Sequence, residues 1–265
     1  MQESSDATKE TIARAYESTK FNEVMDEALH PGGLELTARL AEVAGISSES
    51  RVLDISSGRG TTPCFLASRS GCRVTGIDIS SLSISLAAQK ASNDGLSHRV
   101  DFLLADAERL PFENSSFDVI VSECSFSLLP NKETGVREIA RVLKPGGRFA
   151  FTDVILRFSL SAELISDLTF ECCFSSAETR EGYRQLLTGA GLAEEYFEDH
   201  SKTLKKATYQ VITGYGSLSA FWEQFGSATS PHCPVVEGDP SSRKLWLRMF
   251  QEGKPGYGLF SFTKS

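Results

Sequence analysis

The feature that most constrains the fold is an alternation of short β-branched runs with helix-length segments between about residues 50 and 156. Strands that alternate with helices are typical of βαβ units, in which neighbouring strands are parallel and helices cover the sheet. We therefore predict an α/β fold with a mostly parallel sheet. The predicted strands are Arg51–Ile55, Cys72–Ile77, Arg99–Leu104, Phe117–Glu123 and Arg148–Ile155.

Turn and cap residues agree with this alternation. Thr62 before Pro63 predicts a helix N-cap followed by proline at the first helical position, and the Asn-Asp-Gly stretch at 93–95 predicts a helix C-terminus. The Lys-Pro-Gly-Gly stretch at 144–147 predicts the end of a helix and a turn into the fifth strand, because proline cannot continue a helix and glycine adopts positive φ.

The segments on either side of this region complete the predicted layout. Residues 8–44 are predicted to be helical with a break at His30-Pro31-Gly32-Gly33, and residues 160–190 are predicted to be helical as well. Two further strands are predicted at Leu192–His200 and Gly256–Thr263. The predicted parts of the chain are a helical N-terminal cover at 1–45, a core at 46–200, an irregular insertion or lid at 201–254 with Trp222 and Trp246, and the last strand at 255–265.

Charge and hydrophobicity limit the classes of partner. The 265-residue chain has 27 basic and 35 acidic residues, whereas phosphate-rich partners such as nucleic acids need clustered Lys and Arg. It has no run of about 18 apolar residues, and its N-terminus is polar and acidic, unlike a signal peptide. We therefore expect a cytoplasmic protein that acts neither on nucleic acid nor at a membrane.

The cysteines do not predict a metal site. No two of the six are spaced as a CxxC pair, so neither a zinc ribbon nor a thioredoxin-like site is indicated. Cys64, in the first predicted helix, and Cys72, at the start of a strand, are predicted to be small buried hydrophobic residues. The other four are Cys124, Cys172, Cys173 and Cys233.

The segment from Val52 to Gly60 carries the most chemical information. An apolar strand ends at an acid, Asp54, and continues into a glycine turn before a helix, so a ligand can approach the backbone. A dinucleotide site would have G-x-G-x-x-G, but this chain has Pro63 at the last position, and Asp54 would repel a pyrophosphate. The acid suits a ligand with an ammonium group and no phosphate.

Two further acids follow the second and third strands. Asp78 can accept hydrogen bonds from both hydroxyls of a ribose, as the equivalent acid does in dinucleotide folds. Asp106 can accept one from an adenine amino group. Each acid has a plainer alternative, in which it only caps a neighbouring turn. The ligand predicted by all three acids has an ammonium group, a ribose and an adenine.

These motifs together resemble the class I S-adenosylmethionine-dependent methyltransferases. The resemblance is strong over about residues 45–160 and weaker beyond. The stretches that carry it are Asp54-x-x-x-Gly58-x-Gly60, Asp78, Asp106-Ala107-x-x-Leu110-Pro111-Phe112, Phe117-Asp118-Val119-Ile120 and the run from Arg141 to Gly147. It implies a Rossmann-like, doubly wound, seven-stranded sheet that is mostly parallel, with the last strand antiparallel.

The resemblance also implies roles for individual residues. One position departs from the family, which usually has glycine where this chain has Ser56. The loop at His30 is predicted as a helix break, with closure over the cofactor as the alternative. The implied contacts to S-adenosylmethionine are Asp54 and the turn of Ser56, Gly58 and Gly60 for the methionine part, Asp78 for the ribose, Ile79, Asp106 and Ala107 for the adenine, and a lining residue near Ser122 or Glu123.

Methyl transfer from a sulfonium is a displacement that mainly needs alignment and a dry pocket. A general base is required when the acceptor is a hydroxyl or an acidic carbon, and not when it is a thiolate or arsenic. The candidates for a catalytic role are Glu123 and Cys124 after the fourth strand, followed by His200.

The predicted function is methyl transfer to a small-molecule acceptor. One alternative is a non-catalytic accessory protein that binds the cofactor. Another is an enzyme similar to arsenite methyltransferases that uses the thiols of Cys124, Cys172 and Cys173, because soft thiolates suit trivalent arsenic. A nicotinamide-dependent oxidoreductase is disfavoured by Asp54 and Pro63. The sequence predicts no oligomeric state.

Overall fold

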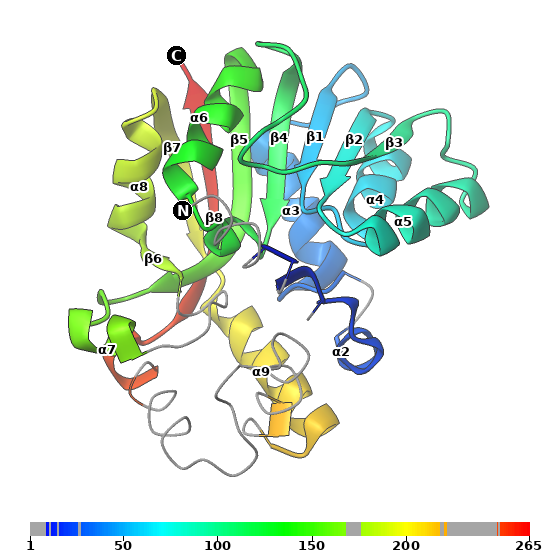
Figure 1. Ribbon diagram of the computed structural model, residues 1–265. Helices are drawn as coiled ribbons and strands as arrows, with labels where there is room; N and C mark the ends of the chain where they lie inside the picture. Colours follow the sequence, from blue (N-terminus) through cyan, green and yellow to red (C-terminus); the bar gives the residue numbers. More distant parts are fainter. Residues whose placement is uncertain are drawn as a thin grey trace.

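The computed structural model describes most of the chain, and Figure 1 shows its elements. The described residues are 9–10, 12–14, 16–25, 28–167, 176–217, 220–221, 248 and 250–265. The strands are β1 (Arg51–Ile55), β2 (Arg73–Asp78), β3 (Val100–Leu104), β4 (Phe117–Glu123), β5 (Leu143–Leu156), β6 (Glu178–Thr179), β7 (Leu192–Asp199) and β8 (Gly256–Lys264). The helices are α2 (Thr19–Val24), α3 (Gly33–Ala44), α4 (Thr61–Ser70), α5 (Ser81–Asn93), the 3-10 helix η1 (Phe126–Leu128), α6 (Lys132–Val142), α7 (Ala162–Asp167), α8 (Arg180–Thr188) and α9 (Ser201–Tyr215).

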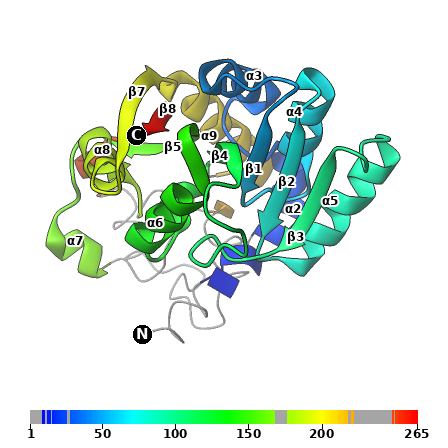
Figure 2. The ribbon, with the colours of Figure 1, turned by 90° about the horizontal axis from the view of Figure 1, so that it is seen from above.

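One sheet holds all the described strands, in the order β3-β2-β1-β4-β5-β8-β7, with the two-residue β6 paired to β5. Strand β8 is antiparallel to both of its neighbours, and β1 to β5 pair in parallel. Helices α3 and α4 lie on one face of the sheet and α6 and α8 on the other (Figure 2). The predicted mostly parallel sheet with an antiparallel last strand is confirmed, and β6 is the one short strand that was not predicted.

The predicted strand bounds hold closely, except at the start of β5. The bounds of β1 and β4 are as predicted, and those of β2, β3, β7 and β8 differ by one residue. Strand β5 begins at Leu143, which pairs with Phe117, and the register shifts before Arg148 pairs with Val119. The stretch at 144–147 therefore ends helix α6, as predicted, but forms an irregular first part of β5 instead of a separate turn.

Two predictions for helices are wrong. Helix α4 begins at Thr61 with Gly60 as its N-cap, so Pro63 is the third helical residue, where its missing N–H costs nothing because the first amides of a helix have no partner within it. Residues 160–190 hold α7, β6 and α8 instead of one helix. Thr179, the last residue of β6, is the N-cap residue of α8, and its hydroxyl accepts a hydrogen bond from the Gly182 amide at 3.0 Å.

The segment at 201–254 is also more regular than predicted, since it begins with the 15-residue helix α9. Trp222, Trp246 and the Ser-Pro-His-Cys-Pro stretch at 230–234 lie outside the described residues. The predicted helix C-terminus at 93–95 is confirmed: α5 ends at Asn93, and Gly95 has a φ of +70°.

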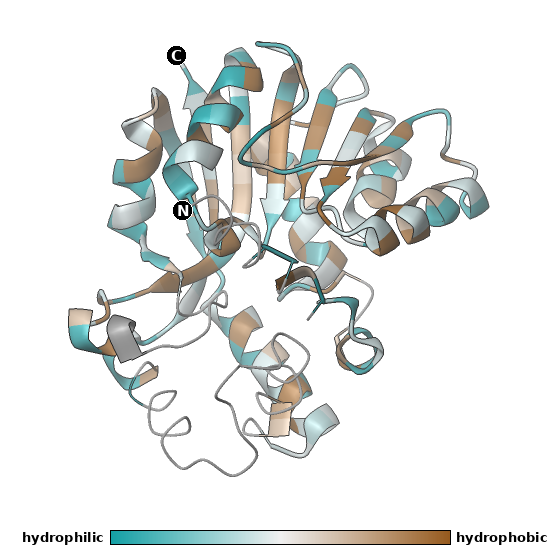
Figure 3. Ribbon diagram, in the orientation of Figure 1, coloured by the Kyte–Doolittle hydropathy of each residue, from teal (hydrophilic) through white to brown (hydrophobic). Residues whose placement is uncertain are grey.

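The core lies on both faces of the sheet, whose strands carry the most apolar residues (Figure 3). On one face, aromatic rings stack across β5 and β8, with the Phe151 and Phe260 ring centres 4.7 Å apart. Cys64 and Cys72 are buried as predicted, and burial raises the pKa of the Cys72 thiol to about 11. Among the described residues, no helix has the length and apolar character needed to cross a membrane.

Candidate active site

A cavity lies at the carboxyl ends of the central strands, where the strand order reverses between β1 and β4. Ligands of open α/β sheets bind in the crevice at such a switch point. The N-terminal segment contributes one side of the cavity, including Lys9, Tyr16, Leu29 and His30. The predicted site residues that line it are Asp54, Ser56, Gly58, Asp78, Ile79, Asp106, Ala107, Glu123 and Cys124.

The turn after β1 has left-handed backbone at three positions, with φ of +60° at Ser56, +52° at Gly58 and +82° at Gly60. A Cβ at Gly58 would meet no atom of the described residues within 4 Å, so this glycine leaves space beside the backbone. A Cβ at Gly60 would lie 2.8 Å from the Phe102 ring. Gly60 is not among the cavity-lining residues. It is the N-cap residue of α4 and lies close to Phe102 and Ala87.

Asp54 is deeply buried, with 2% of its surface exposed. Within the part of the chain that the structure describes, its Oδ2 atom accepts no hydrogen bond. Burial raises the pKa of this carboxyl well above its ordinary value, and the nearby charges of Glu123 and Asp78 raise it further. A buried carboxylate without a partner is costly unless a cation compensates it, so this position suits an ammonium group.

Asp78 organises the glycine turn. The Gly58 amide donates to its Oδ2 atom and the Ser80 amide to its Oδ1 atom, both at 2.9 Å. Burial raises the pKa of the Asp78 carboxyl, and these backbone hydrogen bonds offset part of that rise. Each carboxylate oxygen has two lone pairs, so Asp78 can still accept hydrogen bonds from a ribose.

Asp106 already has a cationic partner. Its Oδ2 atom lies 2.8 Å from the Lys9 ammonium, and its Oδ1 atom accepts a hydrogen bond from the Glu108 amide at 2.9 Å. Lys9 belongs to the N-terminal cover, 97 residues away in sequence. The predicted contact of Asp106 with an adenine amino group would therefore share the carboxylate with Lys9.

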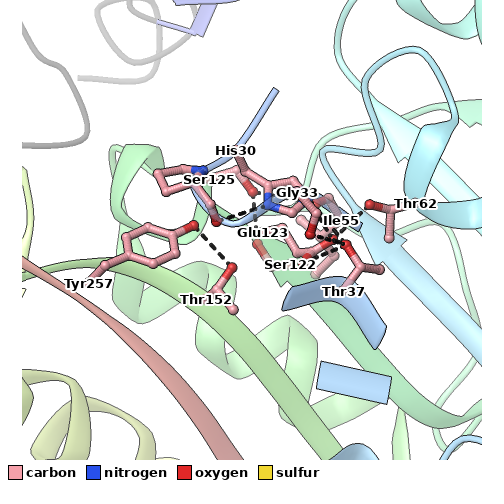
Figure 4. Close-up of polar contacts among 11 residues, drawn as sticks. His30, Gly33, Thr37, Ile55, Thr62, Ser122, Glu123, Ser125, Thr152 and Tyr257 are labelled. Carbon is pink, nitrogen blue, oxygen red and sulfur yellow. Dashed lines mark hydrogen bonds and ion pairs between the residues drawn. The ribbon is translucent and has the colours of Figure 1, made fainter. Parts of the chain in front are cut away.

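Glu123 is held in a network that the sequence did not reveal, shown in Figure 4. Its carboxylate accepts hydrogen bonds from the Thr62 and Thr37 hydroxyls at 2.7 and 3.1 Å, and it lies 3.2 Å from the His30 ring. Only 4% of its side chain is exposed. Burial acts to raise the pKa of Glu123, but the His30 charge and these hydrogen bonds hold it below its ordinary value. The predicted helix break at this loop is confirmed, because residues 28–32 are not helical and α3 begins at Gly33, and closure of the loop over the cofactor stays a prediction.

Cys124 lines the cavity beside Glu123, is half-buried, and has a φ of +55°. Cys172 and Cys173, the other thiols of the arsenic alternative, lie outside the described residues, and Cys64 is buried in α4 away from the cavity lining. Within the described part of the chain, no group of three or more His, Cys, Asp or Glu side chains could hold a metal ion.

His200 is not brought into the cavity. It is the N-cap residue of α9, and its ring lies 3.2 Å from Glu198 at the end of β7. Of the three candidates for a catalytic role, Glu123 and Cys124 therefore lie together at the end of β4, and His200 lies apart from them.

The residues present fit S-adenosylmethionine. Asp54 has an unpartnered buried oxygen for the ammonium group, Gly58 leaves open space beside the backbone, and Asp78 follows the next strand with acceptor capacity for a ribose. These three features follow one another along the chain at the end of β1, in the turn and at the end of β2.

Comparisons with known proteins agree with this fit. A family model described as a methyltransferase domain matches residues 53–151. The chain is 32% identical over 243 residues to methyltransferase GfsG of Streptomyces halstedii, covering 90% of this chain and 82% of that protein. It is 27% identical to a sarcosine/dimethylglycine N-methyltransferase of Halorhodospira halochloris, covering 83% of this chain and 77% of that one.

Among solved structures, the [4+2]-cyclase SpnF superposes with a TM-score of 0.61 at 26% identity, covering 87% of this chain and 80% of that one. One fold can host different reactions, so the match to GfsG over most of both chains, together with the site, decides the family. The chain belongs to the class I S-adenosylmethionine-dependent methyltransferases and is an enzyme that uses S-adenosylmethionine as its cofactor.

Proposed function

We propose that the protein methylates a small, uncharged and largely apolar molecule. The observation that supports this is the cavity wall beyond Glu123, formed by Leu29 of the cover and by the stretch that contains Leu128, Leu129 and Pro130. None of these four side chains carries a charge. Of the Lys and Arg side chains that line the cavity, Lys9 is paired with Asp106 and Glu108, and Arg59 belongs to the glycine turn, so this wall itself offers no cation to the carboxylate of a zwitterionic acceptor such as sarcosine. The net charge of −8 also disfavours a nucleic acid as acceptor.

The cofactor contacts follow the order of the strand ends. We propose that Asp54 holds the ammonium group, that the turn of Ser56 and Gly58, which Gly60 closes at the start of α4, admits the methionine part, and that Asp78 accepts the ribose hydroxyls. The supporting features are the unpartnered Oδ2 atom of Asp54 and the open space at Gly58. For the adenine, the proposed neighbours are the cavity-lining residues Ile79, Asp106 and Ala107.

When bound, S-adenosylmethionine supplies a methyl group that its sulfonium has already activated. The protein's share of the reaction is then alignment of the acceptor and exclusion of water. The cover supports both, because its residues Tyr16, Leu29 and His30 line the cavity.

Glu123 is better suited to positioning than to proton transfer. Its carboxylate is occupied by Thr37, Thr62 and His30, and its pKa is lowered, which makes it a weak base. We therefore propose that Glu123 holds the cover in place and that Cys124 faces the acceptor. Within the described residues, no contact of His200 supports a role in the reaction.

The test is incubation with methyl-labelled S-adenosylmethionine and three groups of acceptors: phenols and hydroquinones, the zwitterions glycine and sarcosine, and arsenite. Binding of S-adenosylhomocysteine is measured in parallel by calorimetry. Transfer to members of the first group supports the proposal. Transfer only to the zwitterions, or only to arsenite, overturns the proposed acceptor class. Binding without transfer to any acceptor would favour the accessory protein.

A further inference from the structure

Three walls of the cavity meet at one carboxylate. Glu108 follows β3 and directly succeeds the lining residues Asp106 and Ala107. Its Oε2 atom lies 2.7 Å from the Lys9 ammonium of the N-terminal cover. Its Oε1 atom accepts a hydrogen bond from the backbone N–H of Asn131 at 2.6 Å.

Asn131 connects Glu108 to the acceptor side. It is the N-cap residue of α6 and directly follows Leu128, Leu129 and Pro130. These three residues belong to the apolar wall that is proposed to face the acceptor, and we call them the acceptor wall. Fixing the Asn131 amide therefore fixes the end of that wall. The Glu108 side chain is only 8% exposed, and Lys9 only 9%. Little water therefore competes for the Lys9–Glu108 pair, so its charge-assisted hydrogen bond is strong, whereas the hydrogen bond from Asn131 is exposed.

The two partners of Glu108 come from distant parts of the chain. Lys9 precedes it by 99 residues, and Asn131 follows it by 23. Burial acts to lower the pKa of Lys9, but its hydrogen bonds to Asp106 and Glu108 raise it above its ordinary value, so the ammonium remains charged. Lys9 reaches both carboxylates, and so the cover is tied at once to the adenine side, through Asp106, and to the acceptor wall, through Glu108.

We propose that Glu108 is a positioning residue that couples the N-terminal cover to the acceptor wall, so that a cover closed over the cofactor also sets the wall for the acceptor. This inference rests on the proposed placement of cofactor and acceptor in the cavity. Coupling needs a group that touches both elements, and Glu108 does so with one oxygen on each. Asp106 ties only the cover, because its second oxygen accepts a hydrogen bond from the Glu108 amide beside it.

The test is hydrogen exchange of the full chain, with and without S-adenosylhomocysteine, in the wild type and in Lys9→Met, Glu108→Ala and Glu108→Gln. The matched controls are Lys202→Met and Glu113→Ala, which change exposed side chains of the same types. Lys9→Met should speed exchange of the amides at 126–129 and 131 about tenfold, although Lys9 donates its hydrogen bonds to Asp106 and Glu108. Glu108→Ala should speed exchange in this segment and in the cover.

Glu108→Gln separates the two contacts, because its amide oxygen can still accept from Asn131 but carries no charge for Lys9. It should resemble Lys9→Met, and combining the two should add little. Affinity for S-adenosylhomocysteine should fall about tenfold in each single variant, the equivalent of one lost charge-assisted hydrogen bond.

If Lys9→Met alters exchange in the cover alone, Glu108 does not couple the two walls and the inference is wrong. The exchange measured without ligand decides this even if the proposed acceptor class fails. Failure of the wild type to bind S-adenosylhomocysteine would instead contradict the proposed function.

Discussion

The carboxyl ends of β1 and β4 differ sharply, although the two strands are paired neighbours. The end of β1 has the buried acid Asp54, and Ser56 two residues later has a left-handed backbone. The end of β4 has the buried acid Glu123, and the next residue, Cys124, has a left-handed backbone as well. Asp54 has an oxygen without a described partner and a raised pKa, whereas Glu123 has three partners and a lowered pKa.

The difference shows how two buried acids at one sheet edge serve different purposes. Glu123 is compensated within the protein, by side chains of α3, α4 and the His30 loop, and so it stabilises the fold. Asp54 is not compensated by a described side chain, and so it favours a cationic ligand over the empty cavity. Variants that affect folding and binding separately can test this contrast.

The largest effect is expected for Glu123→Ala. Removing one member of a buried charge network leaves the other members without their acceptor, and such losses cost about 3 to 5 kcal/mol. The free energy of unfolding, measured by urea denaturation, should fall by about that amount. The control is Glu113→Ala, at an exposed position, which should leave it unchanged. A fall of under about 1 kcal/mol would show that the Glu123 network contributes little to the fold.

Asp78→Ala should weaken binding of S-adenosylmethionine by about 1 to 3 kcal/mol, through lost hydrogen bonds to the ribose. The same variant leaves the Gly58 and Ser80 amides without their acceptor, so unfolding should also become easier. Calorimetry and urea denaturation measure the two effects, with the exposed Asp101→Ala as control. Unchanged affinity for the cofactor would exclude Asp78 from the ribose site.

Asp54→Asn should separate binding from folding. Removing the charge takes away the partner of the ammonium group, so affinity for S-adenosylmethionine should fall by about 1 to 3 kcal/mol. Removing an uncompensated buried charge should leave the free energy of unfolding equal or higher by about 1 kcal/mol. A loss of stability as large as that of Glu123→Ala would end the contrast between the two acids.

The pH dependence should have opposite signs at the two acids. The folded protein raises the pKa of Asp54, so its ionisation weakens folding as pH rises above the ordinary value of 3.8. The lowered pKa of Glu123 adds stability above the ordinary value of 4.5, and this is lost as pH falls. Without ligand, Asp54→Asn should therefore gain stability relative to the wild type as the pH rises from about 3.8. A difference that stays constant as the pH rises from this value would contradict the raised pKa.

The acids at the strand ends could be predicted from sequence because a parallel sheet brings the carboxyl ends of its strands to one edge. The β-branched runs also gave correct bounds for β1 and β4. The partners of Glu123 could not be predicted, because Thr37 and Thr62 lie 86 and 61 residues away and no periodicity encodes such contacts. The same holds for Lys9 and its two carboxylates. Only the Pro-Gly-Gly stretch after His30 hinted at a loop near the cavity.

The smallest effect is expected at the two left-handed residues that follow these acids, Ser56 and Cys124. Glycine avoids the steric cost of positive φ, about 1 to 2 kcal/mol, but loses more conformational entropy on folding, so Ser56→Gly should raise the free energy of unfolding by only about 0.5 to 1 kcal/mol. Cys124→Gly should raise the free energy of unfolding by a similar amount through the backbone, but it also loses the packing contacts of the half-buried Cys124 side chain.

The two variants should differ in methyl transfer. Methyl transfer should persist in Ser56→Gly, since the related family usually has glycine there, and should fall in Cys124→Gly if the thiol faces the acceptor. Urea denaturation and transfer assays on this matched pair decide whether the two strand ends differ in chemistry beyond their acids, and equal transfer by both variants would remove Cys124 from the acceptor site.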